Sequence, residues 1–242
     1  METNLKNKKI LITAGPTREY IDPVRFISNE SSGKMGYAIA EALHQMGADV
    51  TLVSGPVAIT SSFPKHKIIS VLTGQQMFEA CEKYFETTDI AIFCAAVADY
   101  TPKVTSDIKI KKIENQTTLE LQKNVDIAFE FGKVKRQNQK SVGFALETNN
   151  IHENAIVKLK KKNFDLVVLN SPNANEGFGY DTNKITIVGK DLTLHAFALK
   201  DKKEVALDII SAVKELYRDK HLSTTLSQKK TFKNENNENI KF

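Results

Sequence analysis

The 242-residue sequence contains no tryptophan and only two cysteines, Cys81 and Cys94. Both cysteines sit in apolar stretches, so we interpret them as reduced core thiols in a cytoplasmic protein. The sequence also lacks a C-x-x-C pair, and its five histidines are scattered without metal-ligand spacing. These absences argue against a zinc site and against a serine hydrolase.

Long hydrophobic runs are missing as well. No segment approaches the roughly 20 apolar residues that a membrane-spanning helix needs. The N-terminal residues METNLKNKK are polar and contain no apolar core of a secretory signal. The net charge is +5 at pH 7, which suits either nucleic acid or small anionic substrates and does not choose between them.

Two familiar nucleotide-binding motifs are also missing. A dinucleotide-binding fold places G-x-G-x-x-G directly after its first strand, whereas here Gly15 is followed by Pro16. A Walker A loop ends in G-K-[ST], whereas Gly33-Lys34 is followed by Met35. Both classes are weakened by these differences.

What the sequence does contain is an alternation of short apolar runs with helical patterns. We predict strands at residues 9–14, 49–53, 67–72, 89–95, 140–146 and 165–170, and a terminal hairpin at 185–188 and 192–198. Apolar residues at three- and four-residue spacing predict helices near 35–46, 77–85, 153–162 and 205–217. This order favours an α/β fold with a doubly wound, mostly parallel sheet. We expect a flexible N-terminus at 1–8, one domain at 9–220 and a disordered polar tail at 221–242.

Ligands of such sheets bind at the carboxyl ends of the strands, which directs attention to residues 28–34. Ser31 and Ser32 are candidate N-caps for the following helix, Gly33 lets a ligand approach the backbone, and Lys34 adds a positive charge. A helix start of this kind suits a phosphate group. The alternative is a capped helix behind a long surface loop.

Asp99 follows the strand predicted at 89–95 and could hold a magnesium ion that bridges phosphates, or accept a hydrogen bond from a nucleotide. A simple turn cap is the alternative. Ten residues later, Lys109 and Lys111 would share one side of an extended flap, where a lysine can stabilise charge at a phosphoryl centre. A solvated lysine face is the alternative.

Three further segments carry weaker signals. Asn124 or Asp126 could cap a helix, Phe144 could stack on a base or belong to the core, and Lys158 and Lys162 share one helix face. Alone, none of these decides a function.

Together, the motifs closely resemble the phosphopantothenate–cysteine ligase family. They are TAGPTRE (13–19), DPVRFISNESSGKMG (22–36), VTLVSGP (50–56), AAVADY (95–100), KIKK (109–112) and GFALETNN (143–150). The resemblance runs from about residue 9 to residue 217 and implies a Rossmann-like fold with an extended dimerisation flap at residues 100–121. It also implies coupling of 4′-phosphopantothenate to L-cysteine, with CTP as co-substrate and Mg²⁺ as cofactor, through an acyl-cytidylate.

The resemblance assigns two catalytic residues. Asn29 would act on the acyl intermediate, and Lys109 would neutralise charge at the α-phosphate. The resemblance implies a homodimer in which Lys109 can serve the neighbouring subunit's site. Binding positions for the nucleotide follow in the same way: Phe93, Cys94, Ala95, Asp99, Asn124, Val125, Asp126, Ile127, Phe144, Lys158 and Lys162. The helix-terminus argument adds Ser31, Ser32, Gly33 and Lys34 as phosphate contacts. The family commonly has proline where this chain has Val125.

Two other functions are weighed against this one. An NADP-dependent Rossmann-type oxidoreductase is disfavoured by the missing glycine fingerprint. A basic module for RNA or DNA would need aromatic residues among exposed basic ones, whereas most of the 13 phenylalanines occupy periodic apolar positions. We therefore expect no nucleic-acid or membrane partner. The Met1 start and the polar tail favour a stand-alone ligase.

Overall fold

The computed structural model describes residues 4–111, 118–146, 151–170 and 180–217. Within them, one eight-stranded sheet has the order β13-β12-β10-β9-β6-β1-β4-β5. The six strands β5, β4, β1, β6, β9 and β10 are parallel to one another. At the edge, β12 pairs antiparallel with β10, and β13 pairs antiparallel with β12. The bounds are β1 Lys9–Ala14, β4 Asp49–Ser54, β5 Ile68–Ser70, β6 Ile90–Phe93, β9 Lys140–Leu146, β10 Leu166–Asn170, β12 Ile185–Gly189 and β13 Leu194–Ala196.

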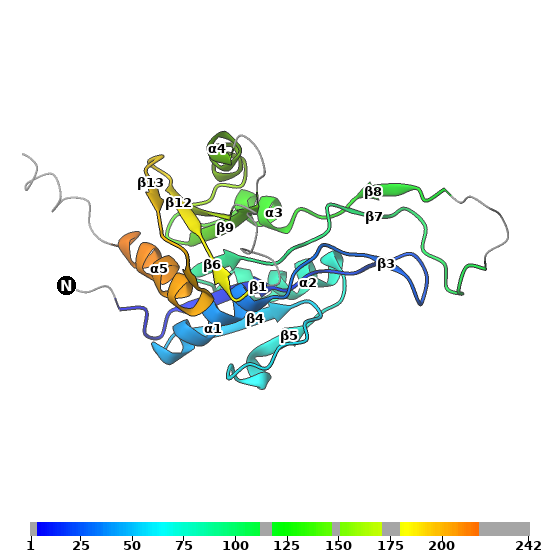
Figure 1. Cartoon of the computed structure of the whole chain (residues 1–242), viewed down its shortest axis with the longest axis horizontal. Coiled ribbons are helices and arrows are strands. Elements are labelled where there is room, and N and C mark those ends of the chain that lie inside the picture. The colour runs from blue at the N-terminus through cyan, green and yellow to red at the C-terminus, as the bar shows by residue number, and fades with distance from the viewer. Residues whose placement is uncertain (1–3, 112–117, 147–150, 171–179, 218–242) are drawn as a thin grey trace, which may run out of the picture.

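Helices cover both faces of this sheet (Figure 1). They are α1 Lys34–Gln45, α2 Gly74–Phe85, α3 Ile127–Val134, α4 Ile151–Lys161 and α5 Lys202–Glu215, with a short 3₁₀ helix, η1, at Lys65–Lys67. Helices α1 and α5 pack together on one face, and α2, α3 and α4 lie on the other.

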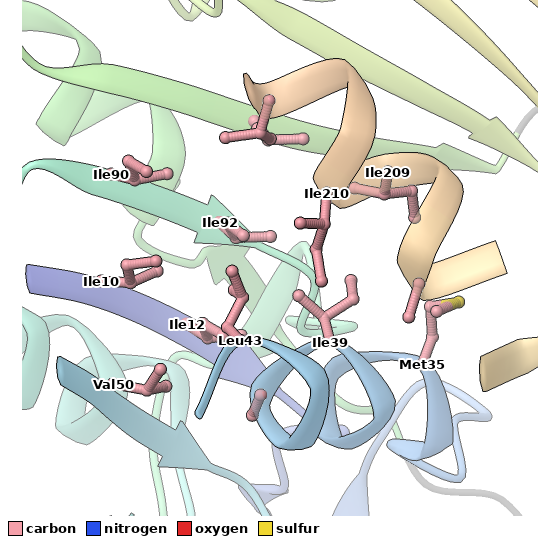
Figure 2. Close-up of a cluster of buried hydrophobic side chains, with 14 of the residues drawn as sticks. Ile10, Ile12, Met35, Ile39, Leu43, Val50, Ile90, Ile92, Ile209 and Ile210 are labelled. Carbon is pink, nitrogen blue, oxygen red and sulfur yellow. The ribbon is translucent and has the colours of Figure 1, made fainter. Parts of the chain in front are cut away.

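The strand β1 shows how the sequence builds both layers. Ile10 and Ile12 belong to the buried cluster shared with α1 and α5, whereas Leu11 between them belongs to the cluster on the opposite face. Figure 2 shows Ile10 and Ile12 of β1 on the same side of the sheet as Ile39 of α1 and Ile210 of α5, and all four belong to one cluster. Successive side chains of a strand point to opposite faces, so a strand covered on both sides is apolar throughout.

Short strand pairs lie outside the main sheet. Two of them are β2 Glu19–Tyr20 with β3 Phe26–Ile27, and β11 Thr182–Asn183 with β14 Lys200–Asp201. The third, β7 Tyr100–Pro102 with β8 Leu121–Lys123, forms the base of an arm that projects far from the sheet beside β3 (Figure 1). We call residues 100–111 and 118–123 the arm.

Every helix in the described ranges is too short or too polar to span a bilayer.

The predicted α/β class and doubly wound, mostly parallel sheet are confirmed, as is the antiparallel hairpin near the end of the sheet. Several elements are shorter than predicted: residues 67–72 contain a three-residue strand after η1, and the strand predicted at 89–95 spans Ile90–Phe93. The tail predicted at 221–242 and residues 1–3 of the predicted flexible N-terminus lie outside the described residues. Within the described part of that N-terminus, Leu5 is buried in the core, and the flexibility predicted for residues 1–8 stays a prediction.

Candidate active site

A cavity of about 860 Å³ opens at the carboxyl ends of the central parallel strands. Numbered along the chain, the parallel strands have the order 3-2-1-4-5-6, which reverses between β1 and β6. Residues that follow or end these two strands, Thr13 and Phe93 among them, line the cavity. Ligands of doubly wound sheets bind at this reversal point because the loops diverge there and leave a crevice.

The N-terminus of α1 forms one wall. Its N-cap is Gly33, whose φ of +75° is favourable only for glycine, and no side chain caps the helix. The prediction that Ser31 or Ser32 caps α1 is therefore wrong: Ser31 Oγ instead accepts a bond from the Gly33 N–H at 3.3 Å. Both serines still line the cavity with Lys34, so this helix start remains suited to an anion.

Asn29 lies on a second wall, on a loop that is fastened to the segment after β6. Its Nδ2 donates to the Val97 carbonyl at 2.9 Å. The neighbouring Ala98 N–H donates to Thr17 Oγ1 at 3.1 Å, and Ala95 N–H donates to Thr13 Oγ1 at 3.2 Å. The loops after β1 and β6 thus hold each other at the cavity mouth.

Asn124 and Asp126 connect the arm to α3. Asn124 Nδ2 donates to the Ala98 carbonyl at 3.0 Å, and its N–H donates to the Asp99 carbonyl at 2.8 Å. Asp126 caps α3 by accepting from the Phe129 N–H, and it forms an ion pair with Lys162 at 2.9 Å. The cap expected from this segment is confirmed, and the ion pair brings Lys162 to the cavity.

The cavity wall is rich in lysine. Besides Lys34, Lys158 and Lys162, it includes Lys123, Lys161 and Lys202, which sequence reasoning did not select. Lys202 is 9% exposed and donates to the Tyr180 carbonyl at 2.5 Å. Burial lowers the pKa of Lys202, the charge of Lys34 lowers it further, and Asp181 raises it. No motif marks Lys202, since it begins a helix far along the chain from the other site residues.

Cys81 and Cys94 are both free thiols, but only Cys81 is fully buried. Cys94 is half-buried in the cavity wall, so its assignment to the core is only partly correct. Burial raises the pKa of the Cys94 thiol to about 12, and the charge of Lys202 opposes this only weakly. The thiol is therefore protonated at neutral pH and is not an activated nucleophile.

The structure gathers nearly all predicted site residues around this cavity. Those lining it are Asn29, Ser31, Ser32, Gly33, Lys34, Phe93, Cys94, Ala95, Asp99, Asn124, Val125, Asp126, Ile127, Phe144, Lys158 and Lys162. Lys109 is the exception: it is exposed on the arm and does not line the cavity of its own chain. Within the described ranges, no cluster of three His, Cys, Asp or Glu side chains could hold a metal ion by itself.

This fold and site define a Rossmann-like α/β protein whose ligand cavity, at the reversal of strand order, is lined by lysines and a helix N-terminus. The family model of the DNA/pantothenate metabolism flavoprotein C-terminal domain matches residues 5–217, and the chain belongs to this family.

Several relatives are similar to this chain over most of its length. The chain is 46% identical over 213 residues to the coenzyme A biosynthesis bifunctional protein CoaBC of Bacillus subtilis, covering 88% of this chain and 52% of that protein. It is 50% identical over 213 residues to a cysteine/cysteine sulfinic acid decarboxylase from an unknown prokaryotic organism, covering 88% and 59%. The chain thus spans between half and three-fifths of the length of these curated relatives.

Among solved structures, the crystal structure of the C-terminal domain of CoaBC superposes with a TM-score of 0.75 at 41% identity. That match covers 88% of this chain and 97% of the other. A DNA/pantothenate metabolism flavoprotein from Streptococcus pneumoniae superposes with a TM-score of 0.74 at 23% identity, over 87% of this chain and 100% of that one, and supports the fold alone.

Proposed function

We propose that this domain is a phosphopantothenate–cysteine ligase that couples 4′-phosphopantothenate to L-cysteine in coenzyme A biosynthesis. CTP is the proposed co-substrate, and the products are phosphopantothenoylcysteine, CMP and pyrophosphate. The proposal also places the reaction in the cytoplasm. The relatives named coenzyme A biosynthesis bifunctional proteins support the pathway, since the chain shares their C-terminal part.

The observation that carries the proposal is the convergence of Asn29, Asp99 and Lys162 on one cavity. These residues come from three segments far apart in the chain, and each occupies a position that the family resemblance assigns to the ligase. Lysines on several walls suit a ligand with many negative charges, such as a triphosphate beside a phosphorylated acid.

The proposed chemistry has two steps. The substrate carboxylate oxygen attacks the α-phosphorus, and the bond from that phosphorus to pyrophosphate breaks. The cysteine amine then attacks the acyl carbon, the bond to the CMP oxygen breaks, and the amine proton passes to solvent. A carboxylate is a poor acyl donor until its oxygen becomes part of a good leaving group, so the first step makes the second possible.

The chain's own groups have defined roles in this scheme. Lys109 neutralises charge that develops at the α-phosphate, and Asn29 donates its amide hydrogen bond to the acyl intermediate. The helix start at Ser31–Lys34 and the lysines at 158 and 162 hold the nucleotide phosphates. Phe144, which is half-buried in the wall, offers a face for the base.

A magnesium ion fits this site only as a companion of the phosphates. Asp99 is exposed at the cavity and offers one carboxylate, whereas the described residues provide no protein-only cage. Mg²⁺ is commonly held by one or two carboxylates together with substrate phosphates. When bound it would neutralise phosphate charge, and Asp99 would be its protein ligand.

A second copy of the chain is the proposed partner. The arm exposes large apolar side chains, Val104 at 76% and Ile108 at 77%, which an isolated chain leaves in water. Lys109 lies between Ile108 and Ile110 on the same arm, and it does not line the cavity of its own chain. A homodimer in which the arm reaches the neighbouring cavity would bury these side chains and deliver Lys109.

Neither competing function has comparable support. For an NADP-dependent oxidoreductase, the turn after β1 lacks the glycine fingerprint, and β4 ends in Ser54 before Gly55-Pro56 rather than near a ribose-binding acid. The decarboxylase name of one relative describes a protein of which this chain matches 59%. The described residues that line the cavity fit the proposed ligation.

The test is product analysis with 4′-phosphopantothenate, L-cysteine, Mg²⁺ and each of the four nucleoside triphosphates in turn. We expect cysteine-dependent amide formation with CTP, together with CMP and pyrophosphate. Lys109→Gln should slow the first step, whereas Lys103→Gln, a matched arm lysine paired with Glu120 at 3.2 Å, should not. Release of a nucleoside diphosphate and phosphate, or no turnover with any nucleotide, would refute the mechanism.

A further inference from the structure

Asp22 is a fully buried carboxylate in the turn between β2 and β3, outside the cavity described above. Within its own turn it accepts bonds from the Val24 N–H at 2.9 Å and the Arg25 N–H at 2.8 Å. It also accepts from Arg25 Nε at 3.0 Å and Nη2 at 2.6 Å. Both guanidinium bonds go to the same carboxylate oxygen, Oδ2, and this ion pair fixes the Arg25 side chain against Asp22.

The remaining partner of Asp22 comes from the arm. The Ile110 N–H donates to Asp22 Oδ2 at 3.1 Å, and the Ile110 carbonyl accepts from Arg25 Nη2 at 2.6 Å. Both polar backbone groups of one arm residue are therefore held by the turn. Two further bonds join the same segments: Ser106 N–H donates to the Ile21 carbonyl at 3.0 Å, and Thr105 Oγ1 donates to the Tyr20 carbonyl at 3.2 Å.

The charge on Asp22 is what makes this junction strong. Burial alone would raise the pKa of Asp22, but bonds from the Val24, Ile110 and Arg25 backbones and from the Arg25 side chain hold it well below its usual value. The carboxylate is therefore ionised throughout the neutral range. Hydrogen bonds to a charged acceptor are roughly twice as strong as neutral ones.

The residue held by this junction is the direct neighbour of Lys109, whose exposed side chain starts one position earlier on the arm. The strand β3 on the other side of the turn leads to Asn29 within four residues of Arg25. We infer that Asp22 is a positioning residue: it fixes the arm at Ile110 and thereby sets where Lys109 reaches the reacting phosphate. This inference rests on the proposed function for the role of Lys109.

The substitution Asp22→Asn separates charge from size. Asparagine has one acceptor oxygen and one NH₂ group, and an NH₂ group at the place of Oδ2 would face the Ile110 N–H and the Arg25 guanidinium, so the single bond from the arm to this side chain is lost. A misplacement of about 1 Å at a reacting group can lower a rate about 100-fold. We expect nucleotidylate formation to slow roughly 10- to 100-fold, with unchanged affinity for CTP, because Asp22 does not line the cavity.

A double-mutant cycle decides whether Asp22 acts through Lys109. Single-turnover formation of the acyl-nucleotidylate is measured for the wild type, Asp22→Asn, Lys109→Gln and the double variant. If Asp22 positions Lys109, the double variant is as slow as Lys109→Gln alone. Asp107→Asn, which changes an exposed carboxylate on the same arm, serves as the control and should behave as the wild type.

Hydrogen exchange at the Ile110 amide gives a readout that does not depend on activity. Asp22→Asn should lose protection there, while Asp107→Asn keeps it. Unchanged protection, an unchanged rate, or effects of the two substitutions that multiply would each overturn the inference. If Asp22→Asn fails to fold, Ile110→Pro removes the same N–H from the arm side and should slow the same step. Absence of turnover by the wild type would instead refute the proposed function, and the exchange data would still decide whether Asp22 holds the arm.

Discussion

Asn29 is held at the cavity by its own amide group, and this contact makes its proposed role testable. Its Nδ2 donates to the Val97 carbonyl at 2.9 Å. In Asn29→Asp, a carboxylate oxygen would face that carbonyl without a hydrogen between them, which is repulsive. We expect amide formation to fall about 100-fold, as for removal of one donor to a developing charge, and nucleotidylate formation to fall much less.

Separate assays of the two half-reactions measure this difference. Nucleotidylate formation is followed by pyrophosphate release without cysteine, and amide formation by adding cysteine to the preformed intermediate. Asn138→Asp makes the same chemical change at an exposed position away from the cavity and should leave both steps intact. Equal loss of both steps in Asn29→Asp would show that Asn29 does not act on the acyl intermediate.

At this scale, most of the site could be predicted because its residues lie near or just after strand ends within short motifs. Asn29, Asp99 and Phe144 are examples, and all three line the cavity. Lys202 could not be predicted because its position depends on how α5 packs against α1, a contact between distant parts of the chain. The capping role given to Ser31 and Ser32 was wrong because a left-handed Gly33 begins the helix without a side-chain cap.

Among the elements, α1 lies unusually close to β1, and Gly36 permits this approach. A Cβ atom added at Gly36 would lie 2.6 Å from the Ala14 Cβ. Alanine improves helix propensity by about 1 kcal/mol over glycine, but overpacking a core costs about 1–3 kcal/mol. We expect Gly36→Ala to be destabilising on balance by about 1 kcal/mol, which lowers the melting temperature by about 2–4 °C in a protein of this size.

The second-site change Ala14→Gly provides the control, because it removes the atom that the new methyl group meets. The double variant should lose less unfolding free energy than the sum of the losses in the two single variants, because residues in contact couple. Thermal unfolding of the four proteins measures this coupling. Strict additivity would mean that α1 accommodates the methyl group in another way.

The sheet and its helices were predictable because its central strands are apolar on both faces and the helices have apolar stripes, as Ile10, Leu11 and Ile39 illustrate. The hairpin β2–β3 and the arm gave no such pattern. Their pairs are two or three residues long, and much of the arm is exposed, so burial leaves no periodic signal. Alternation at Lys109 and Lys111 suggested an extended segment there, but only the family resemblance gave a flap with bounds at residues 100–121.

For the whole molecule, the central question is whose cavity Lys109 serves. The lysine is exposed on an arm whose apolar side chains Val104 and Ile108 are also exposed to solvent, and it does not line the cavity of its own chain. We therefore predict a homodimer with shared active sites, and sedimentation velocity should show a dimer at micromolar concentration. Ile108→Asp should shift the protein toward monomer because it places a charge in the proposed interface.

Mixed dimers of two inactive variants test the sharing directly. Lys109→Gln and Asn29→Asp subunits are co-expressed with different tags, and the dimer carrying both tags is isolated. If Lys109 acts across the interface, one site contains both changes and the other contains neither, so about half of the wild-type activity returns. If Lys109 acts within its own chain, each site carries one change and activity stays low. Dimers of a single variant carrying both tags provide the baseline, and recovery no greater than that baseline would contradict the shared site.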